Sequence, residues 1–96
     1  MKPSDAWQHH RPEIRAIVTA HRARNARIFG SAATGRDTEG SDLDLLVDPT
    51  PETTLLDIGA IRHELRQLLG MPVDVLTPGA LPDGLRERVV SEAVPV

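Results

Sequence analysis

The chain has 96 residues, a formal net charge of −3 and no cysteine. This length indicates one small domain with a modest core, and the absence of cysteine excludes disulfides and thiolate metal sites. The slightly acidic balance gives no reason to expect direct nucleic-acid binding. The sequence has no apolar run that would indicate a signal peptide or a membrane span. We therefore expect a cytoplasmic protein.

The first third of the chain predicts a helix, a strand and a loop. Residues 1–10 are polar, and we expect them to be loosely ordered. Pro12 can open a helix at its first position. One face of that helix is formed by Ile14, Ile17, Val18 and His21. A short strand at residues 26–29 stops at Gly30, and residues 30–41, with three glycines, predict a functional loop or a very short helix.

The centre of the chain predicts a strand followed by a helix. Residues 42–47 alternate with a period of two, which is typical of a strand, and Pro49 ends it. Thr54 and Asp57 have the spacing of a capping box at the start of a helix that Gly70 stops. The apolar stripe of this helix consists of Ile58, Ile61, Leu65, Leu68 and Leu69.

The last quarter predicts a third strand at residues 72–76 and a final helix that starts near Pro82. The buried side of that helix is expected to be Leu85, Val89 and Val90. The tail at residues 93–96 is too short to form an element alone, and packs on its own sheet or on a partner. The order of elements predicts one α/β domain over residues 1–96, with a small mixed sheet of about three strands and flanking helices.

Three aspartates stand in predicted strands, where this residue type is depleted. Asp42 and Asp44 are two residues apart, so their side chains share a face, and Asp74 lies in another strand. Ionised carboxylates repel one another unless a cation intervenes, and Mg²⁺ prefers oxygen ligands. The alternative is a solvated outer face of an edge strand. The same-face pair, the nearby loop and the third aspartate favour a metal site.

The loop can hold a phosphate beside those carboxylates. Gly30 allows a close approach to the backbone, and the Ser31 hydroxyl and nearby N–H groups can bind phosphate if a helical turn begins there. Gly-Ser after a strand is by itself more often an ordinary turn. Other motifs fail: a P-loop needs Lys and Ser/Thr where Arg36 and Asp37 stand, and a zinc-protease motif needs His at Gln67.

Together the two halves resemble a known signature. Gly30-Ser31, Gly35 and the run from Ser41 to Val47 are similar to the motif of the polymerase-beta-like nucleotidyltransferase superfamily. More narrowly, the chain resembles the minimal nucleotidyltransferases of prokaryotic HEPN/MNT toxin–antitoxin pairs. The resemblance runs from about residue 12 to the C-terminus. One departure is Thr34, where many relatives carry Arg.

The resemblance implies a role for each residue of the motif. Asp42 and Asp44 would bind two Mg²⁺ ions, and Asp74 would complete the catalytic and metal site. Gly30, Ser31 and Ser41 would bind the nucleoside triphosphate, with ATP as the expected substrate.

It also implies an antitoxin that transfers AMP to a protein hydroxyl, a tyrosine of a partner HEPN toxin. The alternative is a non-catalytic antitoxin that neutralises the HEPN ribonuclease by direct binding. Transfer to a small molecule such as an aminoglycoside suits a longer chain better.

Overall fold

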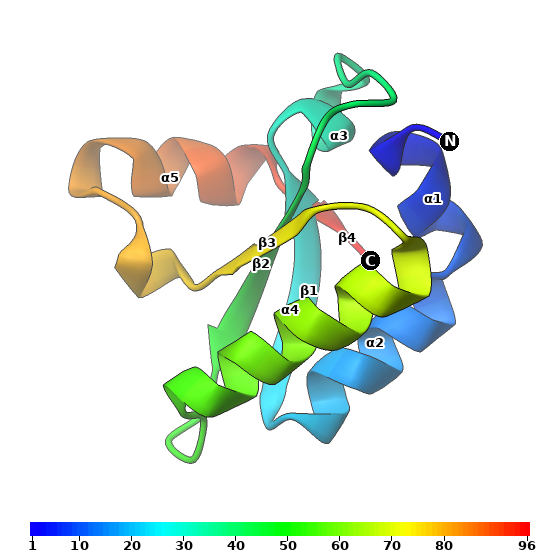
Figure 1. The fold of residues 1–96 in the computed structure, drawn as a ribbon. Helices are drawn as coiled ribbons and strands as arrows, with labels where there is room; N and C mark the ends of the chain where they lie inside the picture. Colours follow the sequence, from blue (N-terminus) through cyan, green and yellow to red (C-terminus); the bar gives the residue numbers. More distant parts are fainter.

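The computed structural model describes all residues from Met1 to Val96. Its elements are α1 (Pro3–His9), α2 (Arg11–Ala20), β1 (Ala23–Phe29), α3 (Ser31–Thr34), β2 (Leu43–Pro49), α4 (Leu55–Leu69), β3 (Val73–Leu76), the 3-10 helix η1 (Pro78–Ala80), α5 (Asp83–Glu92) and β4 (Val94–Pro95). Figure 1 shows them arranged around one sheet. No helix is both long and apolar enough to cross a membrane.

The sheet has four strands in the order β3-β2-β1-β4, one more than the sequence predicted. β2 is parallel to β3 and antiparallel to β1, so the sheet is mixed as expected. The additional strand is the C-terminal tail, which pairs antiparallel with β1. The Val96 N–H donates to the Ala26 carbonyl at 2.9 Å. The tail therefore packs on its own sheet.

The core lies between the sheet and the helices α2 and α4, which run side by side across one face (Figure 1). Leu43, Leu45 and Val47 point into this core and are fully buried, as their alternation predicted. The predicted capping box forms between Thr54 and Asp57, and Gly70 ends α4 in the left-handed conformation. The intervening side chains of β2 consequently face the other side of the sheet.

The N-terminal segment differs from its expectation of loose order, because residues Pro3–His9 form helix α1. Trp7 is buried in the core, and the Arg11 guanidinium lies 4.6 Å from the centre of its ring. The Ser4 N–H donates to the buried Asp37 carboxylate at 2.7 Å. Seven residues with three buried positions are too few to produce a helical period that can be read from the sequence.

Helix α5 also differs from its expectation of a buried side. None of its residues is buried, and Leu85 and Val90 are 49% and 41% exposed. The helix lies away from α2 and α4 and contacts only β1 and η1 to any extent (Figure 1). One apolar side of α5 is therefore only partly covered by the sheet.

Candidate active site

The turn from β1 into α3 brings a backbone glycine against an acidic side chain. Gly30 has φ 73° and ψ −151°, a combination available essentially only to glycine. A Cβ atom built on Gly30 would lie 2.6 Å from Oδ2 of Asp44. The missing side chain therefore lets the Asp44 carboxylate lie directly against this turn.

The parallel pairing of β2 and β3 brings two of the predicted aspartates together. Asp44 and Asp74 are register partners on adjacent strands, so their side chains leave the same face of the sheet. This is the face opposite the core, because the flanking residues Leu43 and Leu45 are core residues. Asp42 lies one residue before β2 and is exposed.

Negative charge accumulates around the half-buried Asp44. The pKa of Asp44 is raised above its ordinary value, first by burial and then by the charges of Asp74 and Asp42. Both effects disfavour the ionised carboxylate, and a cation bound nearby would reverse them. Asp44 therefore lies within range of the charges of both other predicted aspartates.

Helix α4 supplies an arginine to this acidic face. Arg66 donates from Nε to the Val73 carbonyl at 3.2 Å, and its Nη2 lies 4.0 Å from Oδ1 of Asp74. Arg62 and Arg66 also line a cavity of about 190 Å³ with Gly59 and His63. The sequence placed the two arginines one turn apart but gave no signal that β3 lies beside them.

The two predicted serines lie at opposite ends of the loop. Ser31 is half-buried at the first position of α3, directly after Gly30. The Ser41 Oγ accepts a hydrogen bond from the Thr38 N–H at 2.9 Å, so this hydroxyl orders the turn that leads into β2. Asp37, between them, fixes the loop to α1 through Ser4. Asp37 was not predicted as a structural anchor, since its partner is far away in sequence.

Oxygen donors at this site match a hard divalent cation. No group of three or more His, Asp or Glu side chains is arranged as a coordination set. The Asp44 carboxylate nevertheless lies within range of the charges of Asp42 and Asp74, and the one ion pair of these three aspartates is that of Asp74 with Arg66. Mg²⁺ is commonly bound by one or two carboxylates plus phosphate oxygens and water, which this set can provide. The residues therefore fit such an ion.

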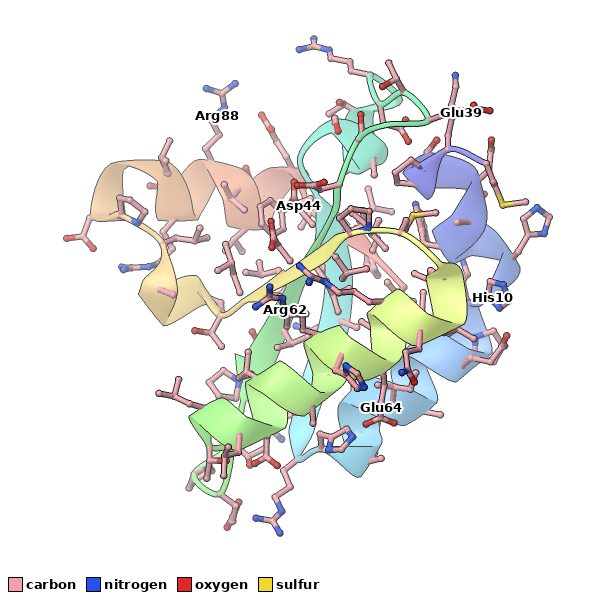
Figure 2. The ribbon with its side chains drawn as sticks, in the orientation of Figure 1. His10, Glu39, Asp44, Arg62, Glu64 and Arg88 are labelled. Carbon is pink, nitrogen blue, oxygen red and sulfur yellow. The ribbon has the colours of Figure 1, made fainter.

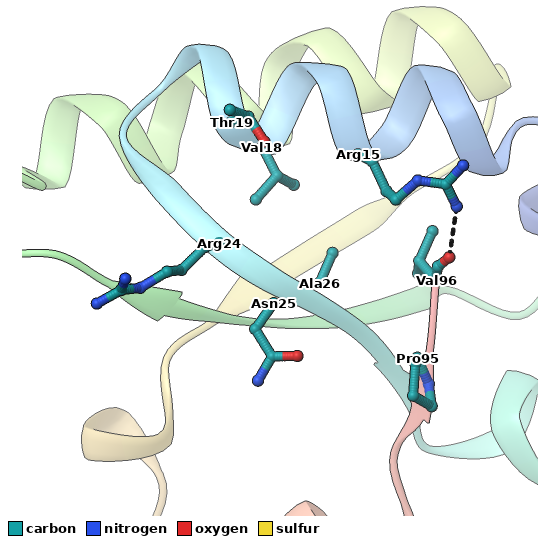
Figure 3. A pocket seen from close by; sticks show the side chains of 8 residues that line it. All are labelled: Arg15, Val18, Thr19, Arg24, Asn25, Ala26, Pro95 and Val96. Atoms are coloured by element: carbon teal, nitrogen blue, oxygen red, sulfur yellow. Dashed lines mark hydrogen bonds between the residues drawn. The ribbon is translucent and has the colours of Figure 1, made fainter.

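The largest cavity of the structure lies elsewhere. It measures about 260 Å³ and opens between α2, the start of β1 and the C-terminal strand (Figure 3). Its lining includes Arg15, which donates to the Val96 carbonyl at 2.7 Å, but no carboxylate side chain. The start of β1 pairs with the end of β2 at Asp48 and Pro49, whereas Asp44 pairs with Phe29 at the other end. This cavity is therefore remote from the aspartates.

Acidic residues on one face of an α/β sheet, beside a glycine turn that closely approaches them, suit an enzyme that handles nucleotide phosphates. Comparison with known proteins specifies the class. The chain belongs to the nucleotidyltransferase domain family, whose model matches residues 12–96. It is thus a nucleotidyltransferase, and the matched range includes the predicted motif at residues 30–47 and Asp74.

Two relatives named as protein adenylyltransferases match this chain over most of their own length and most of its length. A protein of Methanocaldococcus jannaschii, assigned as a protein adenylyltransferase, is 39% identical over 84 residues, which are 88% of this chain and 90% of the relative. The protein adenylyltransferase MntA of Thermococcus cleftensis is 35% identical over 90 residues, covering 85% of this chain and 91% of the relative.

Solved structures show the same architecture. A minimal nucleotidyltransferase superposes with a TM-score of 0.88 and 38% identity, covering 97% of this chain and 95% of the other. A toxin–antitoxin complex with AMP-PNP superposes with a TM-score of 0.74 and 19% identity, covering 88% of this chain and 69% of the other. The first match confirms the predicted minimal nucleotidyltransferase, and the second shows the shared fold.

Proposed function

We propose that this chain transfers the AMP group of ATP to a hydroxyl of a partner protein, and that it acts as the antitoxin of a HEPN-type toxin. The observation that carries the proposal is the register pair Asp44 and Asp74 beside Gly30, with Asp42 close enough to raise the pKa of Asp44. Relatives named as protein adenylyltransferases and a fold shared with a toxin–antitoxin complex support the acceptor class.

In the proposed reaction the acceptor oxygen attacks the α-phosphorus of ATP. A phosphorus–oxygen bond forms to the acceptor, the bond to the β-phosphate oxygen breaks, and pyrophosphate leaves. Asp74 accepts the hydroxyl proton, and Gly30 and Ser31 hold the triphosphate through the backbone and a hydroxyl. Mg²⁺ held by Asp42 and Asp44 would supply charge stabilisation at the acceptor and leaving oxygens.

The proposed acceptor is a tyrosine of the toxin. Its hydroxyl has an ordinary pKa near 10, so it needs a base and a cation to react at neutral pH. Asp74 is exposed at an edge strand of the sheet, where a group on another protein can reach it. The AMP group adds a negative charge and a base to the toxin, which would obstruct a ribonuclease site.

Intact-mass spectrometry tests the proposal. A candidate HEPN-type toxin is incubated with ATP, Mg²⁺ and either the wild-type chain or Asp42→Asn. The expected result is a mass gain of one or more AMP groups, a loss of ribonuclease activity, and neither change with Asp42→Asn. Silencing by both proteins without a mass change would show that the chain acts by binding alone.

A further inference from the structure

We infer that the cavity between β1 and α5 binds the base of the nucleotide, and that Val89 and Leu85 of α5 form its apolar wall. The inference rests on the proposed function and assigns a location to a part of the substrate that the aspartates and Gly30 do not contact. The cavity measures about 210 Å³ and is lined by Phe29, Gly30, Leu85, Arg88, Val89 and Glu92.

The cavity adjoins the acidic site through shared residues. Gly30, one of its lining residues, is the glycine against which the Asp44 carboxylate lies. Phe29 pairs with Asp44 across the two strands, and it faces away from the core because Ile28 is a core residue. In Figure 2 Asp44 lies near the end of α5, in agreement with these contacts. A nucleotide whose phosphates lie at Gly30 can therefore place its base here.

The size and lining of the cavity suit a base. A site for a whole drug-sized ligand usually exceeds about 300 Å³ and is mostly apolar with a few polar groups. This cavity is smaller, so it fits one flat group of a nucleotide. The apolar surface comes from Phe29, Leu85 and Val89. At the rim, Arg88 offers a hydrogen-bond donor and Glu92 an acceptor, with Arg88 Nε 3.4 Å from Glu92 Oε1.

The position of the cavity favours the nucleotide over the acceptor as its occupant. In the strand order β3-β2-β1, Asp74 and Phe29 lie on opposite sides of Asp44. An acceptor that gives its proton to Asp74 approaches from the β3 side, and the cavity is on the β1 side. The apolar side of α5 is incompletely buried, which leaves room for a ligand group beside β1.

Val89→Trp would fill the cavity and tests the inference. Binding of ATP and of inorganic tripolyphosphate is measured by calorimetry with Mg²⁺ and without toxin, alongside thermal unfolding. We expect Val89→Trp to weaken ATP binding by about tenfold or more, because base contacts of this kind contribute that much, and to leave tripolyphosphate binding unchanged. Val90→Trp, at an exposed position of α5 outside the cavity, is the matched control and should bind both as wild type.

Leu85→Ser, at a half-exposed position, is the second variant and should weaken ATP binding selectively even if the tryptophan variant misfolds. Unchanged ATP binding by a folded Val89→Trp or Leu85→Ser would overturn the inference while leaving the proposed function intact. Loss of toxin modification with normal ATP binding would assign the cavity to the acceptor, and so overturn it too. If wild type binds neither ligand with Mg²⁺, the proposed function itself fails and the inference falls with it.

Discussion

Asp44 and Asp74 lie directly opposite one another on the parallel strands β2 and β3, although 29 residues separate them in the chain. Together with burial, the charge of Asp74 raises the pKa of Asp44. An acid whose folded-state pKa is raised binds its proton more tightly when folded. The ionised group therefore destabilises the metal-free fold at neutral pH, and stability is regained as the pH falls through the raised pKa.

Asp44→Asn should accordingly melt no lower than wild type in EDTA at neutral pH, and up to a few degrees higher. The substitution removes a half-buried charge and its repulsion from Asp74 while keeping the size of the side chain. Thermal unfolding followed by circular dichroism over a series of pH values checks this. The difference from wild type should shrink as the pH is lowered. A clear loss of melting temperature would identify Asp44 as a structural residue.

Binding of ATP should depend on both the aspartates and a divalent cation. Asp42→Asn and Asp44→Asn should each weaken Mg²⁺-dependent ATP binding by at least about tenfold, because each removes a proposed oxygen ligand. EDTA should abolish wild-type binding, since a triphosphate is repelled by the uncompensated carboxylates. The measurement is calorimetric titration of wild type and variants with Mg²⁺ or EDTA. Equal affinities in all these conditions would contradict the assignment of metal ligands.

Gly30→Ala should damage the site in a way that another glycine substitution does not. The new Cβ would lie 2.6 Å from the Asp44 carboxylate at a backbone conformation that favours glycine, whereas a Cβ on Gly35, with φ 74°, meets no atom within 4 Å. Gly35→Ala should cost about 1–2 kcal/mol of stability through backbone strain alone and retain nucleotide binding. Gly30→Ala should cost more than this and lose nucleotide binding.

Urea unfolding and ATP titration of both glycine variants measure the two effects separately. Similar binding by Gly30→Ala and Gly35→Ala would show that the contact between Gly30 and Asp44 is not needed for the nucleotide.

Arg27 and Asp48 form an ion pair with two hydrogen bonds outside the site. Arg27 is buried and donates to both carboxylate oxygens of Asp48, at 3.0 and 3.2 Å. The Arg27 hydrogen bonds hold the pKa of Asp48 below its ordinary value. The pair therefore stabilises the fold above the pKa that Asp48 has when unfolded, and this contribution is lost as the pH falls through the folded value.

Arg27→Met, which keeps the apolar stem, should destabilise the protein by about 1–2 kcal/mol at neutral pH, a value reduced because Asp48 is partly exposed. The loss should diminish in acid. Arg88→Met removes the exposed pair with Glu92 and serves as the control, with a change of less than about 0.5 kcal/mol. Denaturant unfolding at neutral and acidic pH measures both. An Arg27→Met effect that does not depend on pH would indicate lost packing instead of a lost ion pair.

Local chemistry was sufficient to predict much of this protein. The alternation around Leu43 and Leu45, the Thr54–Asp57 capping box and the stop at Gly70 depend on residues a few positions apart, so each could be read directly. The motif that contains Gly30, Asp42 and Asp44 is equally local, and it indicated the family that comparison confirmed.

The tertiary structure determined the features that depend on contacts between residues far apart in the sequence. Register between β2 and β3 placed Asp74 opposite Asp44, and the free edge of β1 gave the C-terminal tail a strand to pair with. Helix α1 is stabilised by the packing of Trp7 into the core. The apolar side of α5 is only partly buried, because no second layer of helices covers that face of the sheet. These contacts depend on which surfaces meet after the chain has folded. The hydrophobic periods of two residues in a strand and 3.6 residues in a helix contain no information about them.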